Sequence, residues 1–156
     1  MTDWIGDTNS VMKMLAASNH CEEERAEHDY YATEPKAIDC LLEKAKLDKN
    51  IWEIAAGEGH LSKRLIELGY NVKSTDLVYR GFCAGGVDFL ACKDIWDGDI
   101  LTNPPYKYAL EFCEHALELL TEGHSAWMFV KVQFLEGKAR RKLFDTKQLK
   151  AIYVST

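Results

Sequence analysis

The sequence predicts an α/β fold built on a mainly parallel sheet. Short apolar segments of strand length alternate along the chain with segments whose apolar residues recur at helical spacing, and this alternation is typical of α/β domains. The clearest unit is an apolar run over residues 51–56, followed by a glycine turn and a helical pattern. The chain has 156 residues, 47% of them hydrophobic, which is enough to bury the core of one domain.

The first residues of the chain differ from the rest. Residues 1–28 are polar and carry an acidic cluster at residues 22–24, so they form either an N-terminal arm or one short docking helix. We expect the folded domain to span residues 29–156. Its first helix should be capped by Thr33 and have Pro35 in its first turn.

A strand, a glycine turn and a helix are expected after residue 50. Glu53 is the one carboxylate in the apolar run, and Gly57 and Gly59 follow it. The apolar residues after the turn recur at helical spacing: Leu61, Leu65 and Leu68. Glycines let the backbone pass close to a ligand, and a helix N-terminus offers unpaired N–H groups. The third glycine of the dinucleotide fingerprint is absent, which disfavours a dinucleotide-dependent reductase. A tight turn without a ligand stays an alternative.

A second strand is expected over residues 70–75, and it is followed by Asp76. A carboxylate at the tip of the second strand of a Rossmann-like sheet is placed to accept hydrogen bonds from ribose hydroxyls. Three glycines within residues 79–86 predict a loop. A short strand is expected near Val87.

The most specific segment follows a short buried strand expected over residues 99–102. Pro104 and Pro105 fix their φ angles and lack backbone donors, so this segment is neither helix interior nor central strand. What remains is a stiff loop that presents the amide of Asn103, backbone carbonyls and the ring of Tyr106. Amide and carbonyl oxygens accept hydrogen bonds from an –NH₂ group, and a tyrosine ring can stack on a flat base. A rigid surface turn is the alternative.

The remaining elements continue the α/β pattern. Apolar residues between Leu110 and Leu120 predict a helix, and the strongly apolar residues 125–132 predict a strand. A loop and helix are expected over residues 133–145, and a last strand over residues 151–154.

In this order and spacing, the segments resemble the motifs of a known family, the AdoMet-dependent DNA adenine-N6 methyltransferases of the phage and restriction type. Residues 53–59 resemble the first motif of the family and Asp76 the second, and residues 88–89 resemble the third. The fourth motif is matched in full by Asn103, Pro104, Pro105 and Tyr106. Residues 29–35 resemble a segment that precedes the first motif in one permutation class.

The resemblance implies a Rossmann-like methyltransferase fold, with a mainly parallel twisted sheet, helices on both faces and S-adenosyl-L-methionine (AdoMet) as cofactor. A sheet of this family normally has a further strand pair beyond Val154, so the C-terminal strands are expected to be incomplete. The DNA enzymes usually add a recognition region, which a missing segment or a partner would supply here.

The resemblance also implies a role for each site residue. The acceptor is the N6 amine of an adenine flipped out of DNA, with Asn103 and Pro104 as catalytic acceptors of its N–H groups and with Pro105 and Tyr106 against the base. The cofactor contacts are Asp76 to the ribose, Asp88 to the adenine amine, Leu77 and Phe89 to the adenine faces, Gly57 and Gly59 to the methionine portion, Thr33 near its carboxylate, and Glu53 near its amino group. Asp88 as a surface turn acid and Phe89 as ordinary core are the alternatives.

Other functions stay open at this stage. Related enzymes with an Asn-Pro-Pro-Tyr loop act on RNA bases or on a protein glutamine. A chain of this length is also compatible with an AdoMet-binding module that has no catalytic activity. Methyl-transfer products, or their absence beside retained cofactor binding, would separate these possibilities.

Charge and cysteine content set further bounds. A net charge of −6 does not favour tight binding of duplex DNA by the whole surface. Residues 131–150 nevertheless carry seven basic residues against two acidic ones, so this stretch either faces phosphates beside the site or forms a solvated helix face. Five cysteines without a close pair at metal spacing predict reduced thiols in the cytoplasm and no metal site. No apolar run of membrane-spanning length and no signal peptide is apparent.

Overall fold

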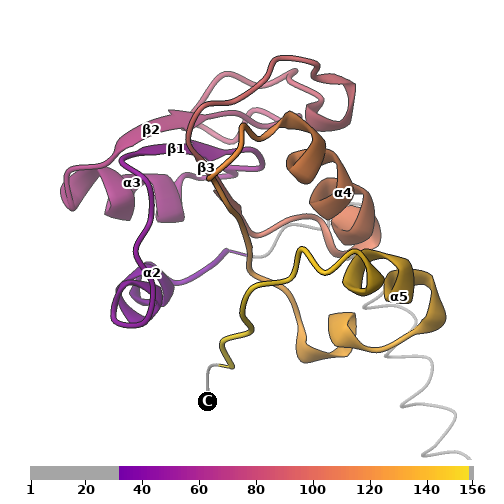
Figure 1. The fold of residues 1–156 in the computed structure, drawn as a ribbon. Coiled ribbons are helices and arrows are strands. Elements are labelled where there is room, and N and C mark those ends of the chain that lie inside the picture. Colours follow the sequence, from indigo (N-terminus) through magenta and orange to yellow (C-terminus); the bar gives the residue numbers. More distant parts are fainter. Residues whose placement is uncertain (1–31, 155–156) are drawn as a thin grey trace, which may run out of the picture. The chain divides into compact units, whose positions relative to one another are not determined.

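The structure is a computed structural model that describes residues 32–154 (Figure 1). Within these residues a sheet of four parallel strands is flanked by helices. The strands are β1 (Asn50–Glu53), β2 (Asn71–Ser74), β3 (Asp99–Thr102) and β4 (Ala126–Met128). The helices are α2 (Lys36–Leu42), α3 (His60–Glu67), α4 (Ala109–Leu119) and α5 (Lys138–Asp145), with short 3-10 turns η1 (Phe89–Ala91), η2 (Tyr106–Tyr108) and η3 (Val132–Leu135). The predicted α/β class with a parallel sheet is confirmed.

The strand order is β2-β1-β3-β4. β1 pairs with β2 on one side, where Ile51 lies opposite Val72, and with β3 on the other, where Ile51 lies opposite Asp99. The chain therefore leaves β1 toward one edge of the sheet and returns to its opposite side. Such a reversal is the topological switch point of a doubly wound, Rossmann-like sheet, and ligands bind there beyond the carboxyl ends of the strands.

Helices cover both faces of the sheet, as predicted. Along β1, Ile51 packs with α2 and α3, whereas Trp52 packs with α4. Leu101 of β3 lies in the same apolar cluster as Ile51, and Ile100 lies in the same cluster as Trp52. Each cluster also contains residues of its helices: Ile38, Leu61 and Leu65 in one, and Phe112, Ala116 and Leu119 in the other. Central parallel strands buried on both faces need apolar residues at successive positions, which explains the apolar run.

Two predicted strands are absent from the described residues. Near Val87 the backbone N–H donates to the carbonyl of Asp76 at 3.0 Å, so this segment turns back on the loop after β2 and joins no strand of the sheet. Residues 151–154 are exposed and extended, and no strand of the described sheet pairs with them. An apolar, β-branched segment forms a strand only where a neighbouring strand can form hydrogen bonds with it.

Several other boundaries differ from expectation. The apolar segment over residues 125–132 forms a strand only at β4 and then enters η3. The N-cap of α2 is Pro35, and no side chain caps this helix, so the prediction that Thr33 caps it is wrong. The loop over residues 79–86 is confirmed. The expected N-terminal arm or docking helix over residues 1–28 lies outside the described residues. No helix in residues 32–154 is both long enough and apolar enough to cross a bilayer.

A buried carboxylate joins the segments at the amino ends of the strands. Asp99, at the start of β3, is 4% exposed. Its Oδ2 accepts hydrogen bonds from the Asp48 backbone N–H at 3.0 Å and from Trp127 Nε1 at 2.9 Å. Its Oδ1 accepts from the Ser125 backbone N–H at 2.9 Å. One side chain thus ties the segment before β1 to β3 and β4.

Replacing this carboxylate should destabilise the fold. Asp99→Ala would leave three donors without their acceptor, and we expect a loss of about 3 kcal/mol in the free energy of unfolding. Urea denaturation measures this loss. Asp94→Ala, at an exposed aspartate in the same connection, serves as control and should change stability by less than about 0.5 kcal/mol. Equal stability of the two variants would contradict the anchoring role of Asp99.

Candidate functional site

The turn after β1 is tied to the tip of β2 by a ladder of hydrogen bonds. The Ala56 N–H donates to the Thr75 carbonyl at 3.0 Å, and the Gly57 N–H donates to Asp76 Oδ2 at 2.8 Å. The other oxygen, Asp76 Oδ1, accepts from the Val78 N–H at 2.8 Å. Asp76 therefore lies beside the glycine turn, where its predicted role requires it. Carboxylate oxygens can each accept more than one hydrogen bond, so contact with a ligand hydroxyl is compatible with these bonds.

Glu53, the last residue of β1, is a buried carboxyl group with hydroxyl partners. It is 2% exposed, and Ser62 of α3 donates a short hydrogen bond to its Oε2. The Ser62 hydroxyl also lies 2.6 Å from that of Ser74 in β2. The pKa of Glu53 is raised to about 8, mainly by burial and less by the charge of Asp76, while hydrogen bonds from the Ser62 hydroxyl and backbone N–H act to lower it. Glu53 therefore holds a proton at neutral pH, and a cation placed nearby would favour its release.

An aromatic ring covers the second glycine of the turn. Gly59 has a φ of +78°, and the space that a Cβ at this position would need is filled by the ring of Phe82. The Lys63 Nζ atom lies 5.1 Å from the centre of the same ring. Phe82 was missed by the sequence analysis, which treated residues 79–86 as a plain loop. Its signal is a single phenylalanine in a glycine-rich loop that directly follows Asp76.

The remaining predicted adenine contacts lie in different surroundings. Leu77 is 62% exposed, next to Asp76. Asp88 is exposed, and its Oδ1 accepts a hydrogen bond from the Leu90 N–H at 3.1 Å, which caps η1. Phe89 is 2% exposed, and its ring packs at centroid distances of 5.6 Å from Trp52 and 5.1 Å from Phe112. These positions fit the alternatives of a turn acid for Asp88 and a core residue for Phe89.

The loop after β3 gathers side chains from three distant segments. Asn103 Nδ2 donates to Thr33 Oγ1 at 2.8 Å, which joins the loop to the segment before α2. Pro104 is buried. Tyr106 begins η2, and Lys131 Nζ lies 4.6 Å from the centre of its ring. Neither contact is visible in the sequence, because the partners lie far apart along the chain.

The two halves of the site share one edge of the sheet. β1 and β3 are parallel neighbours, so the turn after Glu53 and the loop after Thr102 both leave the carboxyl edge. The structure thus brings the predicted residues of the glycine turn, Asp76 and the loop over residues 103–106 to the switch point. A ligand with a cationic group and hydroxyl groups suits the Glu53 and Asp76 carboxyls on chemical grounds.

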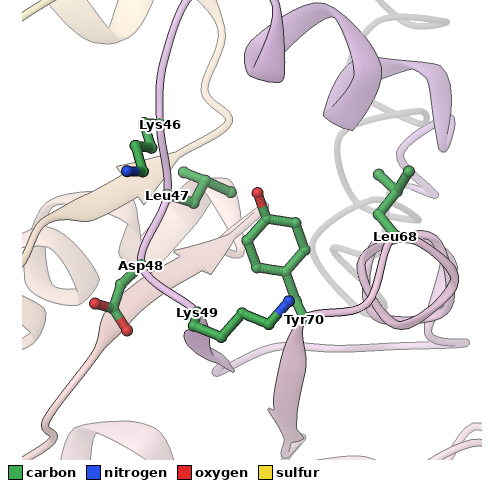
Figure 2. Close-up of a pocket in the computed structure, with 6 residues that line it drawn as sticks. All are labelled: Lys46, Leu47, Asp48, Lys49, Leu68 and Tyr70. Carbon is green, nitrogen blue, oxygen red and sulfur yellow. The ribbon is translucent and has the colours of Figure 1, made fainter.

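A pocket at the opposite edge of the sheet is a separate feature. It has a volume of about 340 Å³ and is lined by Lys46, Leu47, Asp48, Lys49, Leu68 and Tyr70 (Figure 2). Lys49 and Tyr70 directly precede β1 and β2, so the pocket opens at the amino ends of the strands. Lys49 Nζ lies 5.2 Å from the centre of the Tyr70 ring. None of the predicted site residues lines this pocket.

Metal and thiol chemistry have little support in residues 32–154. No group of three or more His, Cys, Asp or Glu side chains in this part of the chain could hold a metal ion. Burial raises the pKa of the Cys113 thiol to about 12, and burial also raises the pKa of Cys92. Thiols with raised pKa values are poor nucleophiles at neutral pH.

Comparison with known proteins places the chain only loosely. No protein-family model and no curated protein matches it. Among solved structures it is similar to TehB from Haemophilus influenzae, with 15% sequence identity and a TM-score of 0.43. The match covers 64% of this chain and 41% of the TehB chain, so the chain spans less than half the length of that protein. So distant a likeness carries no functional argument, and the fold class follows from the strand order itself.

The buried Glu53 should make stability depend on pH. The folded protein keeps the Glu53 proton up to a pH of about 8, whereas the unfolded chain releases it near the ordinary value of 4.5. Folding therefore binds a proton between these values, and this contribution to stability is lost as pH rises, by up to about 1.4 kcal/mol per pH unit. Glu53→Gln should gain stability relative to wild type as pH rises from 5 to 8.

Urea denaturation at several pH values measures this difference, with Glu122→Gln at an exposed position as control. The control should follow the wild-type pH dependence. A constant stability difference between Glu53→Gln and wild type across this range would mean that Glu53 is ionised in the folded protein.

The effect of the contact between Gly59 and Phe82 on stability should be measurable by comparison with a second glycine. Gly59 and Gly123 both have left-handed φ values, +78° and +93°, but a Cβ at Gly123 would meet nothing within 4 Å. Gly123→Ala should therefore lose only about 1–2 kcal/mol of backbone strain. Gly59→Ala should lose more, and part of the excess should disappear when Phe82→Ala is added. Equal losses at the two glycines, without coupling to Phe82, would rule out the contact.

Proposed function

We propose that this chain is an AdoMet-dependent methyltransferase that modifies the exocyclic N6 amine of adenine in DNA. The observation that carries the proposal is the position of the loop from Asn103 to Tyr106. It leaves the carboxyl end of β3 beside the glycine turn that leaves β1, at the switch point of the sheet. The loop that would bind the acceptor amine thus lies beside the turn that would bind a nucleoside-containing cofactor. Methyl transfer between two bound ligands requires them to be neighbours.

The donor set at the turn suits AdoMet. Asp76, at the tip of β2, would hold the ribose hydroxyls, and Glu53 would face the cationic methionine portion. A protonated Glu53 in the free protein is consistent with this, because a bound cation would offset the burial of its charge. The ring of Phe82 covers Gly59, so the methionine portion would meet this glycine only if the ring moves. Thr33, Gly57, Leu77, Asp88 and Phe89 stay predictions as cofactor contacts.

The acceptor loop would act on the nucleophile. AdoMet supplies an electrophilic methyl group, but the lone pair of an adenine amine is delocalised into its ring. The Asn103 amide oxygen and the Pro104 carbonyl would accept the two N–H groups and localise that lone pair on nitrogen. These hydrogen bonds strengthen as positive charge develops, so they favour the transition state over the ground state. No separate base is needed before transfer.

Tyr106 and its neighbours would hold the target base. Its half-buried ring offers a stacking surface beside Pro105, and an adenine must leave the duplex to reach it. Lys131, which lies over the same ring, adds a positive charge beside the loop. Single-stranded acceptors avoid the cost of extruding the base.

The basic stretch over residues 131–150 offers fewer phosphate contacts than its composition predicts. Arg140 donates to the backbone carbonyls of Gln133 and Glu136, and Arg141 lies 3.6 Å from Asp145. The exposed lysines of the stretch are Lys131, Lys138, Lys142, Lys147 and Lys150. With a net charge of −6 and few phosphate contacts, we expect weak DNA binding at physiological salt.

The proposal is tested by labelled methyl transfer from AdoMet to single- and double-stranded DNA, with the product nucleoside identified by mass spectrometry. We expect N6-methyladenine. Asn103→Ala should abolish transfer and leave AdoMet affinity within a few-fold, because the amide serves the acceptor. Asn71→Ala, at the amino end of β2, is the matched control and should keep both properties.

Each other result has a distinct meaning. AdoMet binding without transfer to DNA, RNA or protein would indicate a binding module and refute the proposed activity. Methylated RNA bases or glutamine would retain the reaction and replace the acceptor. Loss of AdoMet binding together with transfer in Asn103→Ala would contradict the role assigned to Asn103.

A further inference from the structure

We propose that the ring of Phe82, held by Lys63, closes the glycine turn in the free protein, and that a ligand displaces the ring when it binds. The inference rests on the proposed function for the identity of the ligand, AdoMet, but the contact that carries it does not. The space that a Cβ on Gly59 would need is filled by the Phe82 ring. A glycine lets a ligand approach the backbone closely, and here an aromatic ring of the same chain takes that place.

The ring lies on the side of the turn where the two acidic side chains of the candidate site lie. The Gly57 N–H donates to Asp76 Oδ2 at 2.8 Å, and the loop that carries Phe82 begins after Asp76. Cys83 directly follows Phe82. Burial raises the pKa of its thiol most, and the charges of Asp76 and Glu53 add to this, so this part of the loop lies near both carboxyl groups. A ligand held by these two carboxyl groups would therefore meet the ring.

The loop is fixed at its base and exposed beyond it. The Gly86 N–H donates to the Leu77 carbonyl at 2.8 Å, which joins the two ends of the loop. Leu77 and Tyr79 are 62% and 70% exposed. Gly81, which precedes Phe82, has a φ of +86°, and a Cβ there would meet nothing within 4 Å. A segment with few buried apolar contacts opens at a low cost in free energy, so the ring can leave the turn while the sheet stays folded.

Lys63 of α3 stabilises the closed position of the ring. Its Nζ atom lies 5.1 Å from the centre of the Phe82 ring, and its backbone N–H donates to the Gly59 carbonyl at 2.8 Å. The ammonium group and the turn thus contact the same ring. Removal of an exposed ammonium group from an aromatic face should favour the open position by about two- to fivefold.

AdoMet affinity, measured by isothermal titration calorimetry, tests the inference. Phe82→Ala should bind AdoMet about tenfold more tightly than wild type, because no ring has to leave the turn. Lys63→Met should bind about two- to fivefold more tightly than wild type and should have no further effect when added to Phe82→Ala. Phe134→Ala, which removes another ring that lies beside a cation, Arg140 at 4.8 Å, is the matched control and should keep the wild-type affinity.

A second readout follows the ring itself. Protons above the face of an aromatic ring resonate upfield in an NMR spectrum, so the Hα signals of Gly59 in free wild type should lie upfield of those in free Phe82→Ala. When AdoMet is saturating, the Gly59 signals of the two proteins should coincide. Circular dichroism and urea denaturation establish that each variant is folded.

The outcomes distinguish this inference from the proposed function. If wild type and Phe82→Ala bind AdoMet equally and the Gly59 signals of bound wild type stay upfield, the inference is wrong and the proposed function is unaffected. Weaker binding by Phe82→Ala would make the ring a ligand contact and refute its closing role. Binding that displaces the ring, without methyl transfer to any acceptor, would support this inference and refute the proposed function. If neither protein binds AdoMet, both fail.

Discussion

The double pairing of β1 determines where the candidate site lies in this protein. β1 bonds to β2 along its whole length and to β3 on its other side, so it is buried on both faces and both edges. Helices must then cover both faces, and the chain must reverse direction across β1. The turn after β1 and the loop after β3 consequently leave the same edge of the sheet, and the residues that differ most from a simple core lie there.

Asp99 at the amino ends of the strands and Glu53 at their carboxyl ends show that burial alone does not determine the role of an acidic side chain. Asp99 accepts three hydrogen bonds from N–H donors, which is how a buried charge is stabilised in a structural position. Glu53 accepts hydrogen bonds from the hydroxyl and the backbone N–H of Ser62, and burial nevertheless raises its pKa. A buried acid with a strongly raised pKa, at the end of the sheet where ligands bind, is a candidate for a functional site. The comparison thus favours the carboxyl edge as the functional one.

Local patterns predicted the local structure. The apolar run, the glycine turn and the helical spacing after it are contiguous in sequence, and β1, the turn and α3 match them. The position of Asp76 after the end of β2 was also predicted, because the turn that follows a strand determines where the strand ends. Two of the errors concern strand pairing: the segments near Val87 and over residues 151–154 have β-favouring composition, but no strand of the described sheet pairs with them. The contacts of Thr33, Phe82 and Lys131 could not be predicted, since each joins segments that only the fold brings together.

The specific tetrapeptide is therefore only part of the candidate site. Its two prolines stiffen the backbone, but they do not determine the rotation of the Asn103 amide or the environment of the Tyr106 ring. Thr33 from before α2 contacts the Asn103 amide, and Lys131 from after β4 lies over the Tyr106 ring. The candidate site thus depends on the fold that brings the three segments together as well as on the motif.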